Sequence, residues 1–134
     1  MDKREKRAQA LLWEVQALRA AGDHVEAAKK SRVMARLHEE LAEQYFGARD
    51  HRGWIHLQAA VTAWAKAGSD DDFACGFRLL ARGFDLSLVG PVGSRAIFEE
   101  LRKLLDWMSL RQHPQSVEPA ERPVVARDKR RAVA

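Results

Sequence analysis

The chain has 134 residues, 46% of them hydrophobic and 31% charged, a length that suits one domain and is too short for two cores. It contains 22 alanines but only one threonine and two isoleucines, and because β-branched side chains favour a pleated sheet, this composition argues against an all-β fold. Cys75 is the only cysteine, which excludes an intrachain disulfide framework and a cysteine-rich metal site.

Apolar residues recur at helical spacing along most of the chain. This pattern predicts an all-α fold, an irregular antiparallel bundle of about five helices. In the first helix, one apolar stripe is formed by Ala8, Leu11, Leu12, Val15 and Leu18. The expected helices span residues 4–20, 24–46, 52–66, 70–86 and 94–110.

Turn and capping signals separate the predicted helices. Gly22 favours the left-handed conformation that follows a helix end, and Asp23 is placed to cap the helix that comes next. The acidic run at residues 70–72 suits the positive end of the fourth helix dipole. Gly76 and Gly83 lie seven residues apart inside that helix, which predicts the close approach of a neighbouring helix on their face.

The helical pattern ends after Gln112. Pro114, Pro119 and Pro123 interrupt a polar stretch that cannot bury enough apolar surface to offset the entropy of ordering it. We therefore expect a helical domain over residues 1–112 and a flexible, basic, Pro/Arg-rich tail over residues 113–134.

The segment ALRAAGDHVEA resembles the tetratricopeptide repeat, whose unit is a helix pair of about 34 residues. Ala17, Gly22, Asp23 and Ala27 occupy the positions where that repeat places its small residues and its turn. Later turns are unevenly spaced, so the motif is degenerate over the residues it covers, about 8–86. The resemblance implies helical hairpins and a groove that binds a peptide.

The sequence assembles no recognisable active site. His38 begins a His-Glu-Glu-Leu-Ala run that has alanine where the helical zinc signature needs its second histidine. His51 and His56 have no carboxylate at ligand spacing near both. Cys75 lies among alanine and phenylalanine without an activating histidine, which is typical of an apolar core thiol. We therefore expect no enzyme activity, no cofactor and no bound metal.

The four tryptophans fall into two groups. Trp54 and Trp64 share one apolar stripe and are predicted to be core residues. Trp13 and Trp107 lie off the stripes of their helices, and tryptophan is enriched at interfaces. These two residues are therefore candidates for contact with a partner protein or with a second copy of the chain.

The formal net charge of +4 is unevenly distributed, with +4 in residues 1–36, −3 in residues 37–110 and +3 in residues 111–134. Basic ends suit nucleic acid or acidic partners. No helix-turn-helix is recognisable, so a solvated charged face is the simpler interpretation. The residues that would follow a phosphate backbone are Arg4, Arg7, Lys29, Lys30, Arg32, Arg36, Lys129, Arg130 and Arg131.

Two functional hypotheses remain. The longest uncharged stretch, residues 53–65, is shorter than the about 18 apolar residues of a membrane span, and Glu14 interrupts the apolar run of a signal peptide. We therefore expect a cytoplasmic protein with no membrane contact. The leading hypothesis is a non-enzymatic protein–protein interaction module, an adaptor or regulator that binds its partner through a helical groove. The alternative is an accessory nucleic-acid-binding regulatory protein that uses both basic ends.

Overall fold

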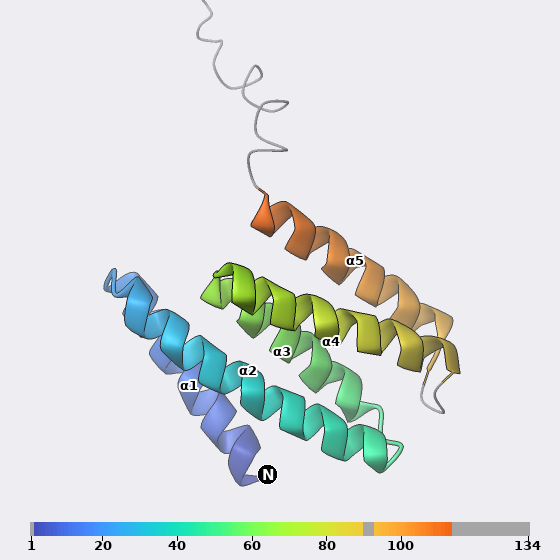
Figure 1. The fold of residues 1–134 in the computed structure, drawn as a ribbon. Coiled ribbons are helices and arrows are strands. Elements are labelled where there is room, and N and C mark those ends of the chain that lie inside the picture. The colour runs from blue at the N-terminus through green and yellow to red at the C-terminus, as the bar shows by residue number, and fades with distance from the viewer. Residues whose placement is uncertain (1, 90–92, 114–134) are drawn as a thin grey trace, which may run out of the picture.

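The computed structural model describes residues 2–89 and 93–113, and within them the chain forms five α-helices and no strand (Figure 1). The predicted all-α fold is confirmed, and each predicted helix end lies within three residues of the observed one. Of the predicted tail, only His113 is among the described residues. The helices are α1 (Lys3–Ala20), α2 (His24–Gly47), α3 (Arg52–Ala67), α4 (Asp70–Val89) and α5 (Arg95–Gln112).

Side chains cap the helices where the sequence predicts. The carboxylate of Asp23 accepts a hydrogen bond from the backbone N–H of Glu26 at the start of α2. The hydroxyl of Ser94 accepts one from Ile97 at the start of α5. Gly22 has a φ of +82°, in the left-handed region that glycine adopts without steric cost. These local signals explain why the helix ends are predictable from the sequence.

Consecutive helices run antiparallel and lie next to one another (Figure 1). The central α3 packs against α2, α4 and α5, whereas α1 packs extensively on α2 alone. Because α1, α3 and α5 point the same way, their C-terminal ends lie at the same end of the bundle (Figure 1). This arrangement leaves α1 and α3 as parallel neighbours on one face of α2.

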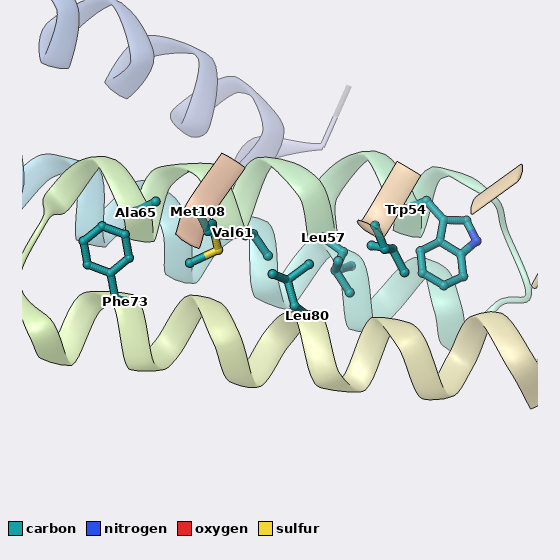
Figure 2. Packing of buried hydrophobic residues seen from close by; sticks show 9 residues of the cluster. Trp54, Leu57, Val61, Ala65, Phe73, Leu80 and Met108 are labelled. Atoms are coloured by element: carbon teal, nitrogen blue, oxygen red, sulfur yellow. The ribbon is translucent and has the colours of Figure 1, made fainter. Parts of the chain in front are cut away.

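The larger part of the hydrophobic core lies between α3, α4 and α5. Figure 2 shows Trp54, Leu57 and Val61 of α3 facing α4, which contributes Phe73 and Leu80. Leu101 and Met108 of α5 are fully buried in the same cluster. The predicted burial of Trp54 is confirmed.

Two glycines of α4 allow its neighbours to come close. A Cβ atom on Gly76 would lie 2.7 Å from the terminal methyl group of Met108. A Cβ atom on Gly83 would lie 3.3 Å from side-chain atoms of Leu57 and Leu101. The close approach predicted from the glycine spacing is therefore confirmed, with α5 and α3 as the neighbours at both positions.

A second core cluster lies between α1, α2 and α3, and Trp64 belongs to it. The predicted burial of Trp64 is confirmed, since its exposed fraction is 4%. The expected stripe on α1 is only partly buried. Leu12 is 39% exposed because α1 packs on one neighbour, and the side of α1 that carries Leu12 borders an open groove. Leu12, a member of the predicted stripe, is therefore not part of the core.

One buried ion pair connects α2 to the start of α4. The guanidinium group of Arg32 donates hydrogen bonds of 2.9–3.1 Å to both carboxylate oxygens of Asp72, which is 3% exposed. The same carboxylate accepts the backbone N–H of Ser69, and the Ser69 hydroxyl accepts the backbone N–H of Asp72. The acidic run thus lies in the first turn of α4, as predicted, and Asp72 both completes the cap with Ser69 and binds α2.

Candidate functional site

A groove of about 520 Å³ lies between the parallel helices α1 and α3, with α2 beneath them. It exists because α1 and α3 both pack on α2 and contact each other little. Alanines at positions 8, 59 and 63 line it and leave space that longer side chains would fill. The other lining residues are Glu5, Gln9, Leu12, Val15, Gln16 and Arg19 of α1, Ser31, Met34 and His38 of α2, and Ile55, His56, Gln58, Thr62 and Lys66 of α3.

Two aliphatic side chains line the open part of the groove. Leu12 of α1 is 39% exposed and Ile55 of α3 is 64% exposed. A single exposed aliphatic residue is common on a protein surface, but two on facing helices beside an apolar concavity are typical of a binding site. Sequence analysis did not identify this pair, because only the helix arrangement places them on the same groove.

Three cationic residues, Arg19, Lys66 and Arg111, lie at one end of the groove, where α1, α3 and α5 end. The guanidinium of Arg19 donates a 2.8 Å hydrogen bond to the carbonyl oxygen of Lys66, and Arg111 donates a 3.4 Å hydrogen bond to that of Ala65. Burial and the charge of Arg111 lower the pKa of Arg19. Among the described residues none of the three cations has a carboxylate partner within 4 Å, so this end of the groove is electropositive.

A chain of polar side chains closes the opposite end. The Nδ1 atoms of His38 and His56 lie 2.9 Å apart, and Nε2 of His56 lies 3.4 Å from a carboxylate oxygen of Glu5. The ring of Tyr45 stacks on His56 with a centroid distance of 5.3 Å. These residues come from α1, α2 and α3, so the chain joins all three helices that form the groove.

The contact between the two histidines limits how many protons they can hold. One Nδ1 atom must donate and the other must accept, and Glu5 favours a proton on Nε2 of His56. Two fully protonated rings would place two N–H groups against each other. Burial, followed by the charge of His56, lowers the pKa of His38 to about 4, so His38 is neutral at pH 7.

We expect acid to destabilise the protein through His38. In the unfolded chain a histidine takes up its proton near pH 6.5, whereas folded His38 does so only near pH 4. The unfolded state therefore binds more protons between these values, and stability falls as the pH is lowered from 6.5 to 4. Because His38 keeps some contact with solvent, the effect is reduced by screening. We expect the free energy of unfolding, measured with urea, to fall by about 2 kcal/mol.

The matched variants for that titration are His38→Gln and His51→Gln. His51 is exposed at the start of α3 and stands outside the histidine pair. His38→Gln should flatten the pH dependence between 6.5 and 4, and His51→Gln should keep the wild-type slope. Equal slopes in the two variants would show that the histidine pair does not control acid stability.

Sequence analysis missed this polar chain, although part of its signal was present. His38 and Tyr45 lie seven residues apart in the second helix and so share one of its faces, and polar residues on a buried face need partners. The sequence places His51 near His56, but the structure pairs His56 with His38 instead. Within the described residues no group of three or more His, Cys, Asp or Glu side chains is arranged so that it could hold a metal ion.

The two tryptophans predicted at an interface lie in different surroundings. Trp13 is 69% exposed on α1, next to Leu12 in the sequence. Trp107 is half-buried against the larger core, and the guanidinium of Arg111 lies 5.4 Å from its ring centroid. Trp13 is therefore available to a partner, whereas much of Trp107 is already covered by the chain itself.

Most of the basic residues proposed for nucleic acid contact have partners within the chain. Arg32 is held by Asp72, and the guanidinium of Arg36 lies 5.4 Å from the ring centroid of Trp64. Lys129, Arg130 and Arg131 lie outside the described residues. The remaining ion pairs are Arg4 with Asp2 and Glu40, Arg7 and Lys30 with Glu14, and Lys29 with Glu26.

The predicted core thiol of Cys75 is half-buried beside the cluster of α1, α2 and α3. The guanidinium of Arg78 lies 3.2 Å from its sulfur atom.

None of the described helices is long and apolar enough to cross a membrane. No family model, curated protein or solved structure matches the chain.

Proposed function

We propose that this protein is a non-enzymatic, cytoplasmic protein–protein interaction module that binds a partner in the groove between α1 and α3. The observation that carries the proposal is the pair of exposed aliphatic side chains, Leu12 and Ile55, on the two helices that flank an apolar concavity of about 520 Å³. Burying such residues on binding contributes about 25 cal/mol for each Å² of apolar surface removed from water. The tetratricopeptide-like hairpin in the sequence agrees with this proposal.

The groove also specifies the chemistry of its ligand. Its middle is mostly apolar and also contains uncharged polar side chains such as Gln9, Gln16 and Gln58. Arg19 and Lys66 lie at one end without carboxylate partners among the described residues. A fitting segment therefore presents apolar side chains to the middle and a carboxylate to the two cations. Trp13 is exposed and lies on α1 four residues after Gln9 and three before Gln16, both of which line the groove, so a partner could extend its contact to Trp13.

Accessory nucleic-acid binding through the two basic ends is the second proposal, and the structure offers it less support. Five of the six helix-borne cations proposed for that role form ion pairs with carboxylates of the same chain. A phosphate backbone would have to compete with those pairs. Phosphate-driven binding weakens steeply between low and moderate salt, so a salt titration separates the two proposals.

Replacing Ile55 with arginine should abolish partner capture. The Ile55→Arg side chain adds a further cation to the groove and removes the apolar contact, so we expect at least a tenfold loss of affinity, about 1.4 kcal/mol or more. The measurement is a pull-down with the full chain at two ionic strengths, followed by titration of the captured protein.

The matched control is Val25→Arg. Val25 is 72% exposed on α2 and does not line the groove, so the same charge is introduced on a surface of similar exposure. Both variants should keep the wild-type helicity by circular dichroism. Equal capture by the two variants would rule out the groove as the binding surface, and capture that disappears at moderate salt would favour nucleic acid.

A further inference from the structure

The chain leaves its last helix beside the cationic end of the groove. Arg111 of α5 donates a hydrogen bond to the carbonyl oxygen of Ala65, and its charge lowers the pKa of Arg19. The described part of the chain ends at His113, two residues after Arg111, and residues 114–134 follow it in the sequence. A segment attached this close reaches an effective concentration in the millimolar range at the groove.

The sequence that follows has the chemistry that the groove requires, in the matching order. Glu118, Glu121 and Arg122 come first and carry a net negative charge, an apolar stretch at residues 123–126 follows, and four of the five residues from 127 to 131 are basic. Along the groove, the cations Arg19 and Lys66 come first, then a mostly apolar middle that also contains uncharged polar side chains, and then the carboxylate of Glu5. The acidic, apolar and basic parts of the segment therefore meet surfaces of complementary character.

The two patterns also have the same length. From Arg19 to Glu5 the helix α1 covers 14 residues, which at 1.5 Å per residue is about 21 Å. From Glu121 to Arg127 the chain covers six residues, which in extended form is about 20 Å. The residues between Gln112 and Glu118 can span about another 20 Å, which is enough to reach the groove from the end of α5.

We propose that residues 118–127 of this chain bind in the groove between α1 and α3, with Glu118 and Glu121 at the cationic end and Val124 and Val125 between Leu12 and Ile55. This inference rests on the proposed function, because it names a second occupant of the same groove. The bound segment competes with the partner. If the segment fills the groove nine-tenths of the time, it lowers the apparent affinity for the partner about tenfold.

The two isoleucines of the chain make the proposal testable by methyl NMR on the full chain. Ile55 lines the groove, whereas Ile97 lies on α5 against the larger core and does not line it. The double variant Val124→Asp/Val125→Asp should shift the ¹³C-methyl resonance of Ile55 by more than its line width and leave Ile97 in place. The double variant Glu118→Lys/Glu121→Lys reverses the charge of the two carboxylates. It should also shift the resonance of Ile55 and leave that of Ile97 in place.

The matched control is Val133→Asp, which makes the same chemical change outside the proposed segment and should move neither resonance. An Ile55 resonance that stays in place in both double variants, or that moves together with Ile97, overturns the proposal. Variant effects that vanish on tenfold dilution would identify a second copy of the chain as the occupant and overturn it as well.

The closing measurements separate this inference from the proposed function. The NMR experiment contains no partner, and the capture experiment with Ile55→Arg does not depend on the segment. If Ile55→Arg abolishes partner capture but the segment variants leave the Ile55 resonance unchanged, this inference is wrong and the proposed function stands. If the segment variants shift the Ile55 resonance but Ile55→Arg leaves partner capture unchanged, the segment binds in the groove and the proposed function is wrong.

Discussion

Replacing Trp64 with alanine is expected to lower the free energy of unfolding by about 3–5 kcal/mol. The side chain is 4% exposed in the core between α1, α2 and α3, and its Cβ atom lies near the backbone of Gly76 in α4. Its indole N–H donates to a carboxylate oxygen of Glu39, and Arg36 lies over its ring. The change leaves a cavity and removes both polar contacts, and urea unfolding followed by circular dichroism measures the loss.

Trp13→Ala is the matched control for that experiment. It removes the same side chain from an exposed position on a helix, since Trp13 is 69% exposed. We expect a change within about 0.5 kcal/mol, as for most surface substitutions. If the free energies of unfolding of the two variants differ by less than about 1 kcal/mol, the buried Trp64 side chain does not stabilise the packing of α1, α2 and α3.

Asp72→Asn should be the second most disruptive of the predicted changes, with an expected loss of about 2–4 kcal/mol in the free energy of unfolding. The substitution keeps the shape of the side chain but leaves the partly exposed Arg32 without its carboxylate. It also weakens the cap formed with Ser69 at the start of α4. Asp71→Asn, at the exposed neighbouring position, should change stability by no more than about 0.5 kcal/mol.

The same pair of variants has an expected acid dependence. Burial raises the pKa of Asp72, but hydrogen bonds from Arg32 and Ser69 outweigh burial and hold it below its ordinary value of 3.8. The stabilisation from Asp72 is therefore present above about pH 4 and is lost as the pH falls below that value. Asp72→Asn should remove this acid-labile part, whereas Asp71→Asn should retain it.

The helices and much of the core follow from local sequence. Caps such as Asp23 and Ser94 mark the helix starts, and the spacing of apolar residues identifies Trp54 and Trp64 as core residues. Both signals act within a few residues of one another, so they do not depend on how the helices pack. The spacing of the two glycines in α4 is also a local signal, so it predicts that a helix packs closely on α4 but does not identify which helix.

The groove and its polar ends could not be predicted in the same way. His38 and His56 are 18 residues apart, and Arg32 and Asp72 are 40 apart, so their contacts depend on the rotation and axial position of one helix against another. Leu12 looked like a core residue because its spacing on α1 fits the stripe. Its exposure depends on α1 having a single extensive neighbour, a property of the assembled bundle.

The unequal attachment of the two groove walls has a consequence for the size of ligand that can enter. The wall formed by α3 is anchored by the larger core, whereas the wall formed by α1 rests on α2 and joins it through the turn at Gly22. A rotation of α1 about that turn would widen the opening and leave the packing between α3, α4 and α5 in place. It would break the hydrogen bond from Arg19 to Lys66 and the contact of Glu5 with His56, and it would disturb the packing of Leu11 in the second core cluster. Bulkier side chains would therefore be admitted by movement of the α1 wall alone.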